Sequence, residues 1–392
     1  MDWLNAFLFF LLIAGHTEFQ VAIVVNRSHA IPLPCGFLRQ LRHVHDVLVP
    51  AFPLVLIWFL GIKGPRLLLG GSWSDVGWSW RVYLAICAVS CVALILTTIA
   101  RRLRRDPACL IASESQVVNI EKELGARPVG AGPYQGLANL SINEMFQLEY
   151  TQKTFELRGL PNELDGLTIM HLSDWHFIGT LDLPYFQYVT DIVTKAESDL
   201  IVFTGDLLDD QRLIDWIEPT LGQMSAPFGC YFILGNHDWY LQPEKTRERF
   251  EQLGWHDVSG TVKLVDTKGH PLAIGGDERP WMGEAPDFSI APENSMRLLL
   301  SHSPDNIKWA KRNAIDLMLA GHNHGGQVRL PIIEAVYSPS IYGCRYASGV
   351  FFEEPTLLYI SRGISGRHPL RWRCLPEITR LTLRSPTAHQ TR

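Results

Sequence analysis

His322 and His324 stand two residues apart in the stretch LAGHNHGGQ, directly after an apolar run at residues 317–320. Glycines flank the pair, so little side-chain bulk surrounds the two imidazole rings. Imidazole nitrogens bind divalent transition metals, and the pair could serve one ion or two. A polar loop without metal would show the same residues, so the rest of the chain has to distinguish these three interpretations.

Four earlier apolar runs also end in polar residues, at residues 167–172, 200–204, 230–234 and 298–300. The candidate ligands at the five ends are Asp174, His176, Asp206, Asn236, His302, His322 and His324. One Asp after a strand is commonly a turn or cap residue, but five such ends in order are hard to explain as caps. Ligands of α/β folds bind at the carboxyl ends of the strands. We therefore predict that the five loops converge on one site.

The chemistry of these seven residues favours a metal centre. Three of them offer oxygen and four offer imidazole nitrogen, while no cysteine joins the set. Such a mixture suits Mn, Fe, Zn or Co better than Ca, and it excludes an iron–sulfur cluster. Seven ligands exceed what one tetrahedral ion uses. A shared carboxylate would hold two ions ~3.5–4 Å apart, the arrangement that serves displacement at phosphorus.

The order of these blocks resembles the calcineurin-like metallophosphoesterase superfamily. The blocks begin at residues 174 (DWH), 205 (GDLLD), 235 (GNHD), 302 (a lone His) and 321 (GHNH). The sequences of the segments HLSDWH, TGDLLD and LAGHNHGGQVRLP, and of the later segments YISRG and PEI, are similar to those of the bacterial membrane-associated branch. The resemblance covers residues 143–385. It implies an α/β fold, a four-layer metallophosphoesterase-type β-sandwich flanked by helices.

The resemblance also implies a role for each ligand. One divalent ion would be held by Asp174, His176, Asp206 and His324. The second would be held by Asp206, Asn236, His302 and His322. Asp206 would bridge the two ions, and a metal-bound hydroxide would attack phosphorus in line. The identity of the ions stays open among Mn, Fe, Zn and Co.

Catalytic roles beyond the ligands follow from the same resemblance. His237 would act as general acid over the leaving group or help to stabilise charge on the phosphoryl oxygens, and Asp238 would orient its ring. Asp209 would lie behind the ligands, although a turn or cap role explains it equally well. Asn323 would contact a ligand or the substrate, with a structural role as the alternative. Asp210, Gln211 and Arg212 follow Asp209, so the phosphate-binding arginine of the Ser/Thr protein phosphatases is absent here.

Charge is distributed unevenly along the 392 residues. Residues 1–105 hold ten Lys/Arg and four Asp/Glu, whereas residues 106–392 hold 25 and 36, a net charge of −11. An acidic C-terminal part argues against nucleic-acid binding, which normally requires a basic surface. The seven cysteines are scattered without a C-x-x-C pair, which fits a reduced compartment better than a disulfide framework.

The N-terminal part has the composition of membrane-spanning helices. Residues 82–100 (VYLAICAVSCVALILTTIA) carry no charge and nearly reach the ~20 residues that span a bilayer. Four arginines follow within five residues, which predicts a cytoplasmic end. Residues 47–62 and 4–25 are weaker candidates, since the first contains two prolines and the second contains Glu18. We predict an integral membrane protein with about three spans and a cytoplasmic catalytic domain.

These signals divide the chain into four parts. Residues 1–105 form the transmembrane helical region, and residues 106–142 form a juxtamembrane linker with one short helix at 119–124. The alternative for residues 106–142 is an extra piece of the catalytic domain. Residues 143–385 form that domain, with an amphipathic helix at 185–196, and residues 386–392 form a tail.

The predicted function is hydrolysis of a phosphodiester, pyrophosphate or phosphomonoester bond. Tethering raises the effective concentration of membrane-borne substrates, so a lipid-linked substrate such as UDP-diacylglucosamine is the favoured hypothesis. The segment 362–373 mixes arginine with Trp372 and could face anionic headgroups, but a packed or solvated loop explains it as well. The alternative function is a catalytically inactive membrane scaffold with a retained phosphoesterase fold.

Overall fold

The computed structural model describes residues 3–386 and divides the chain into two compact units. The helical unit holds the residues up to Arg105 together with Leu330–Arg345, and the catalytic unit holds Asp106–Arg329 and the chain from Tyr346 onward. The prediction assigned residues 330–345 to the catalytic domain, whereas the structure groups them with the helices. Beyond residue 386, the predicted tail lies outside the described residues.

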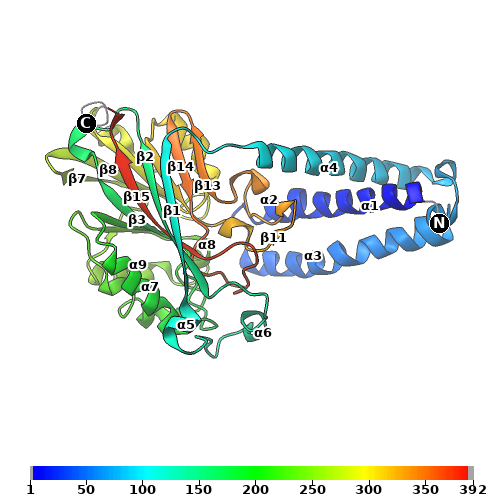
Figure 1. Cartoon of the computed structure of the whole chain (residues 1–392), viewed down its shortest axis with the longest axis horizontal. Helices are drawn as coiled ribbons and strands as arrows, with labels where there is room; N and C mark the ends of the chain where they lie inside the picture. The colour runs from blue at the N-terminus through cyan, green and yellow to red at the C-terminus, as the bar shows by residue number, and fades with distance from the viewer. Residues whose placement is uncertain (1–2, 387–392) are drawn as a thin grey trace. The chain divides into compact units, whose positions relative to one another are not determined.

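The helical unit contains three helices that are long and apolar enough to cross a membrane, at Trp3–Ser28, Gly36–Lys63 and Trp78–Leu103. Their parts are α1 (Trp3–Glu18), α2 (Asn26–Ser28), α3 (Cys35–Leu56) and α4 (Trp78–Leu103), with π-helical turns at Phe19–Val25 and Ile57–Lys63. They run side by side (Figure 1). The first helix contains the polar residue His16, which has a partner on another helix. Its Nδ1 lies 2.5 Å from the hydroxyl of Tyr83 on α4.

A seven-stranded sheet of the catalytic unit has the order β1-β2-β15-β3-β4-β5-β6. The strands are β1 (Leu110–Asn119), β2 (Gln147–Glu156), β15 (Glu377–Arg384), β3 (Thr168–Leu172), β4 (Leu200–Thr204), β5 (Cys230–Ile233) and β6 (His256–Asp257). β3 to β6 pair in parallel, so their carboxyl ends share one edge. β1 pairs with β2 along its whole length, so this part of the predicted linker is instead a piece of the catalytic sheet.

A six-stranded sheet has the order β13-β14-β10-β9-β8-β7. Its strands are β13 (Gly349–Glu353), β14 (Thr356–Ile360), β10 (Leu317–Ala320), β9 (Met296–Ser301), β8 (His270–Asp277) and β7 (Val262–Thr267). The four central strands are parallel, and the two edge strands are antiparallel to their neighbours. A small separate pair is formed by β11 (Arg329–Leu330) and β12 (Glu334–Ala335).

The two sheets pack face to face because successive side chains of a strand point to opposite faces. On β4, Leu200 and Val202 belong to the core between the sheets, while Ile201 and Phe203 belong to a second core under the helices. The second core also contains Tyr185 and Phe186 from α7 (Leu183–Lys195). α7 and α9 (Pro243–Gln252) lie together on that side (Figure 1). The predicted sandwich flanked by helices is confirmed.

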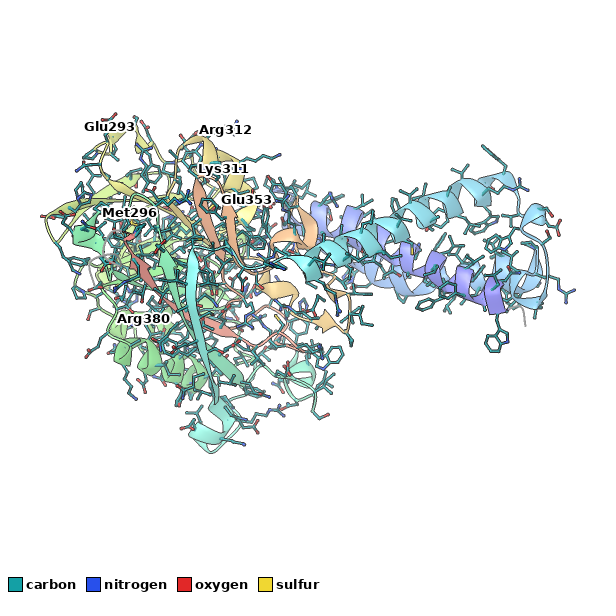
Figure 2. The ribbon with its side chains drawn as sticks, turned by 45° about the horizontal axis from the view of Figure 1, so that its top comes forward. Glu293, Met296, Lys311, Arg312, Glu353 and Arg380 are labelled. Atoms are coloured by element: carbon teal, nitrogen blue, oxygen red, sulfur yellow. The ribbon has the colours of Figure 1, made fainter. Side chains whose placement is uncertain are left out.

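The remaining helices of the catalytic unit are short. They are α5 (Ile120–Leu124), α6 (Gln135–Ala138), α8 (Asn236–Trp239) and α10 (Ile307–Arg312). Asn119 caps α5, so the predicted helix at 119–124 is confirmed, and α7 confirms the helix predicted at 185–196. Lys311 at the end of α10 forms an ion pair of 3.6 Å with Glu353 of β13 (Figure 2).

Candidate metal centre

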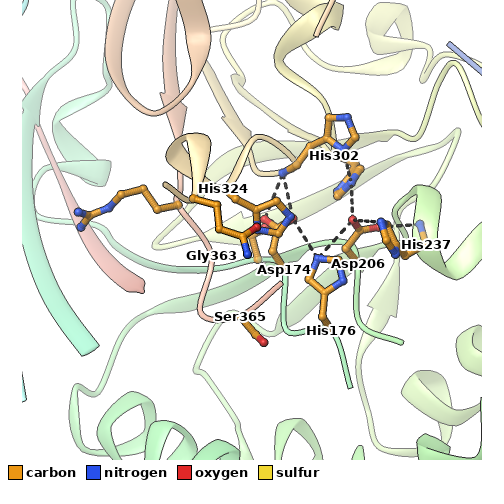
Figure 3. A network of polar contacts seen from close by, with 12 residues as sticks. Asp174, His176, Asp206, His237, His302, His324, Gly363 and Ser365 are labelled. Carbon is orange, nitrogen blue, oxygen red and sulfur yellow. Dashed lines mark hydrogen bonds and ion pairs between the residues drawn. The ribbon is translucent and has the colours of Figure 1, made fainter. Parts of the chain in front are cut away.

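Five parallel strands from both sheets deliver the predicted ligands to one place. Asp174 and His176 follow β3, Asp206 follows β4, and Asn236 opens α8 after β5. His302 follows β9 in the other sheet. His322 and His324 follow β10, and His324 begins a 3₁₀ turn at His324–Gly326. The fully buried strands hold the backbone rigidly up to the residue before each ligand loop. Figure 3 shows the side chains converging.

One group of ligand atoms comes from Asp174, His176, Asp206 and His324, and these atoms all lie within 4.8 Å of one another. His176 Nε2 lies 3.9 Å from Asp174 Oδ1 and 3.6 Å from Asp206 Oδ2. Both His176 Nε2 and Asp206 Oδ2 are buried, and neither has a hydrogen-bond partner among the described residues. Buried polar atoms are normally satisfied, so these two atoms fit the requirement for a cation between them.

A second group consists of Asp206, His302 and His322, again within 4.8 Å. His302 Nε2 lies 3.2 Å from Asp206 Oδ2, 3.1 Å from Asn236 Oδ1 and 3.1 Å from His322 Nδ1. Asp206 belongs to both groups, as a bridging carboxylate would. The structure therefore brings together all seven residues in the two sets that the resemblance implies, and which ion each residue binds stays a prediction.

Hydrogen bonds on the far side of the rings orient two of the ligands. His302 Nδ1 donates to the carbonyl oxygen of Thr204 at 2.7 Å, and His176 Nδ1 donates to Asp209 Oδ2 at 2.8 Å. A ring that donates from Nδ1 presents the lone pair of Nε2. Both Nε2 atoms point at Asp206, so these contacts fix the rings in the tautomer that a metal requires.

The ligand loops are bent into an unusual backbone conformation. Asp174, His176, Asp206, His322 and His324 all have positive φ, between 49° and 69°. Non-glycine residues seldom adopt this region, and clusters of them are typical of functional sites where the surroundings enforce the conformation. Five of the seven predicted ligands share this positive φ, so the requirements of the site, rather than the preferences of the individual residues, determine the shape of these loops.

Glycines let the loops approach one another. A Cβ atom on Gly321 would lie 1.9 Å from Ser173 Oγ and 2.3 Å from Asp174 Oδ2, so no side chain fits there. Gly325 and Gly326 have φ of 63° and 86°, which favours glycine. These two glycines therefore suit the backbone of the turn that follows His324.

The charges of the centre explain why it would attract cations. Burial would lower the pKa of His302, but the carboxylate of Asp206 raises it to about 9. Burial likewise opposes protonation of His176, yet Asp209 and Asp174 raise its pKa to about 10. In the absence of other cations, protons on these rings balance the buried carboxylates. Divalent cations would replace those protons on binding.

Asp209, rather than Asp238, holds the ring of His237. His237 Nδ1 lies 2.5 Å from Asp209 Oδ1. Asp238 is buried and instead accepts hydrogen bonds from backbone N–H groups, including those of Asp206 (3.0 Å) and Leu208 (2.9 Å). The expectation that Asp238 orients the ring is therefore corrected. Asp238 shapes the loop that carries the bridging ligand.

The C-terminal segment contributes residues that the sequence did not identify. Arg371 is fully buried and donates to the carbonyl oxygens of His324 (3.0 Å), Arg362 (2.8 Å) and Ser365. Ser365 N in turn donates to the carbonyl oxygen of Asp174 at 3.0 Å, close to the network of Figure 3. Arg371 thus fastens the segment to two ligand loops. For this arginine the packed-loop interpretation is correct, because it faces the protein interior.

Arg367 is placed differently from its neighbours. Its Nη1 lies 3.8 Å from Asp209 Oδ1, and 38% of its side chain is exposed. Its Nε is buried without a hydrogen-bond partner among the described residues. His237 is another partly exposed group beside Asp209, with 21% of its side chain accessible. Arg367 and His237 therefore flank the same carboxylate oxygen where the centre meets solvent.

Two further residues near the centre have defined partners. Asn323 is buried and donates from Nδ2 to the carbonyl oxygen of Tyr346 at 2.8 Å, which supports the structural alternative for this side chain. His171, on β3, points away from the ligands and lies 2.9 Å from Thr204 Oγ1. Burial lowers the pKa of His171 to about 4, so this ring is neutral and part of the core.

Comparisons with known proteins agree with these features. Residues 167–326 match the family model described as calcineurin-like phosphoesterase. The chain is 31% identical over 272 residues to an uncharacterized metallophosphoesterase, YkuE, of Bacillus subtilis, covering 67% of this chain and 94% of that protein. It is 29% identical to the phosphodiesterase YaeI of Escherichia coli, over 55% of this chain and 81% of that one. A Danio rerio transmembrane protein with metallophosphoesterase domain is 30% identical, over 57% and 55% of the two chains.

Proposed function

The chain belongs to the calcineurin-like phosphoesterase family, and on that premise we propose that it hydrolyses a phosphodiester or pyrophosphate bond of a lipid-linked substrate at a membrane. The observation that carries the proposal is the pair of buried atoms without a hydrogen-bond partner among the described residues, His176 Nε2 and Asp206 Oδ2, beside the partly exposed side chains of His237 and Arg367. An inactive scaffold has no need for such a centre.

We assign the ligands on the basis of the family's metal dependence and the grouping of the side chains. Asp174, His176, Asp206 and His324 would hold one divalent ion, and Asp206, Asn236, His302 and His322 would hold the other. Ions bound there supply Lewis-acid stabilisation of phosphoryl charge and a nucleophile generated from water at neutral pH. We leave their identity open among Mn, Fe, Zn and Co.

The protein's own residues then handle the proton and the leaving group. His237 is the only predicted catalytic ring with a partly exposed side chain, and Asp209 fixes its Nδ1 as a donor. Its Nε2 therefore faces the open side of the centre, 4.0 Å from Asp206 Oδ2. A protonated Nε2 at this position would deliver a proton to the leaving oxygen.

Arg367 supplies a binding group for the substrate. The phosphate-binding arginine of the protein phosphatases is missing here, because Asp210 follows Asp209, and the nearby Arg212 pairs with Asp210 at the surface. Arg367 instead brings a guanidinium to the same carboxylate from the C-terminal segment. A planar guanidinium can form bidentate hydrogen bonds with phosphoryl oxygens. We therefore propose that Arg367 binds a phosphoryl group of the substrate.

The helical unit supports the proposal of a lipid-linked substrate. Three helices have the length and composition of membrane spans. Membrane anchoring of the catalytic unit would concentrate it beside lipid-borne phosphoesters. The basic cluster at Arg101, Arg102, Arg104 and Arg105 favours a cytoplasmic position for the catalytic domain. UDP-diacylglucosamine is one substrate of this class.

A substrate panel tests the proposal on the full chain in detergent. Each of the four candidate metals is added in turn, and rates are compared for a soluble diester, a soluble monoester and a lipid-linked pyrophosphate. We expect the highest kcat/KM for the lipid-linked compound. Efficient turnover of the soluble diester with none of the lipid-linked one would remove the lipid part of the proposal. Purified protein that binds no metal and turns over nothing would support the scaffold.

A further inference from the structure

We propose that the turn at residues 330–333 inserts into the interfacial layer of a lipid bilayer, as a second membrane contact besides the three helices. This inference rests on the proposed membrane anchoring, since it places the turn at the level where α4 would leave the bilayer. The bilayer itself would contact the turn, and the residues that fasten the turn all belong to the helical unit.

The loop that contains the turn is fastened to the ends of the apolar helices. Arg101 Nη1 donates to the carbonyl oxygen of Ala335 at 2.6 Å, and Arg102 Nε donates to that of Ile332 at 2.9 Å. The buried Asn26 binds the loop twice, donating to the carbonyl oxygen of Val336 at 3.1 Å and accepting from Ser338 N at 3.0 Å. Residues from the first and third helices therefore determine the height of the loop along the bundle.

The backbone at the apex is strained. Ile332 has φ of 71°, and Ile333 N donates to the carbonyl oxygen of Pro331 at 2.9 Å. This is a γ-turn with a positive φ at its central residue, which is rare and strained. A β-branched residue in that conformation is a strong outlier. Glycine or asparagine would adopt this conformation with less strain. The presence of isoleucine therefore indicates that its side chain has a function at this position.

The apex presents apolar side chains instead of burying them. Ile332 is 67% exposed in the described structure, and Leu103, next to Arg102, is 74% exposed. Exposed apolar groups beside arginines are what the headgroup boundary of a bilayer accommodates, because the side chains reach the acyl region while the guanidinium groups meet phosphates. Ile332 lies level with Arg102 through their hydrogen bond, so it would enter that boundary.

The consequence concerns the metal centre. Leu330 follows the predicted ligand His324 by six residues, and Tyr346, where the chain leaves the loop, accepts the hydrogen bond from Asn323. The turn and the ligand loop 322–326 are therefore joined by a short covalent segment.

Depth-dependent quenching tests the proposal on the full chain in nanodiscs. A dansyl amino acid is incorporated at Ile332, at Leu96 in the middle of α4 (60% exposed) or at Ile290 of the catalytic unit (59% exposed). Acyl chains carry a nitroxide either near the headgroup or deep in the bilayer. We expect the shallow quencher to reduce emission at position 332 about twofold more than the deep one, as for an interfacial group. The order should reverse at 96, and neither should act at 290.

The three positions separate the possible failures. Quenching at 96 without quenching at 332 would overturn the inserted turn and leave the anchored phosphoesterase intact. No quenching at 96 would overturn membrane anchoring and the turn with it. A blue shift at 332 without quenching, present only when a disc holds two copies, would assign the turn to a dimer contact and also overturn the proposal. The melting temperature of each variant verifies folding, since all three positions are exposed.

Discussion

Asp209 joins the predicted general acid to a predicted metal ligand: its Oδ1 lies 2.5 Å from His237 Nδ1, and its Oδ2 lies 2.8 Å from His176 Nδ1. Burial would raise the pKa of Asp209, but the two rings lower it well below its usual value. The carboxylate therefore stays ionised across the physiological range. One side chain sets the tautomers of both rings, so the predicted metal binding by His176 and the predicted proton transfer by His237 both depend on Asp209.

Replacing Asp209 by Asn should therefore impair both functions. The amide has one acceptor oxygen and no charge, so it can satisfy only one of the two Nδ1 donors. We expect kcat/KM to fall about 10–100-fold, with weaker metal binding, as for other residues that orient metal ligands. Asp210→Asn is the matched control, because that neighbour pairs with Arg212 at the surface. Equal losses in the two variants would count against the assigned role.

His237→Gln should separate chemistry from metal binding. His237 donates from Nδ1 to Asp209 and is not part of either predicted ligand set. We expect kcat to fall roughly 10²–10⁴-fold, the usual contribution of a general acid, while bound metal measured by mass spectrometry stays unchanged. His302→Gln should instead lower the metal content, because His302 Nε2 faces Asp206. A metal content in His237→Gln as low as in His302→Gln would assign His237 to an ion.

Arg367→Gln tests the proposed phosphoryl contact. The guanidinium is partly exposed beside Asp209, so its loss should weaken substrate binding without emptying the metal centre. Because charge-assisted hydrogen bonds contribute about 1.5–3 kcal/mol each, we expect KM to rise about 10–100-fold. Arg373→Gln, on the same segment but exposed, is the control. A drop in bound metal with unchanged KM would show that Arg367 supports the ligands instead.

The ligand set was predictable because it depends on local sequence. Each ligand follows an apolar run, and a fully buried strand must end where its apolar run ends. Parallel pairing then brings the ends together without further information. The left-handed backbone at residues such as Asp206 could not be foreseen, since it is imposed by the neighbouring loops rather than by the residue type.

Contacts between distant segments were beyond the reach of the sequence. Asp238 follows His237 directly, which suggested that it orients the ring, but the turn of α8 points its carboxylate at backbone N–H groups. Asp209, which lies 28 residues before His237 in the sequence, orients the ring instead. The sequence left open whether the segment with Arg371 faces headgroups or packs inward, and the structure shows its guanidinium donating to three carbonyl oxygens in the interior. Side-chain direction decides such cases, and composition does not encode it.

The buried ion pair of Glu377 and Arg362 predicts how stability depends on pH. Glu377 Oε2 lies 2.9 Å from Arg362 Nε at the start of β15, and both side chains are largely buried. Burial would raise the pKa of Glu377, but Arg362 lowers it to about 2, against an ordinary value of 4.5. A carboxyl group with a lowered pKa stabilises the fold above its ordinary pKa, and this stabilisation is lost as the pH falls toward 2.

Glu377→Gln should therefore lower the melting temperature of the full chain at pH 7, by an amount equivalent to roughly 3 kcal/mol. The difference from the unsubstituted protein should shrink as the pH falls from 5 to 3, because the unfolded chain then binds a proton at Glu377 while the folded protein, with its lowered pKa, keeps the carboxylate ionised. Intrinsic fluorescence during heating in detergent measures both proteins. Glu218→Gln is the control, since the Glu218–Arg249 pair is more exposed and should contribute at most about 1 kcal/mol. A difference that stays constant from pH 7 to pH 3 would show that lost packing, rather than charge, destabilises the variant.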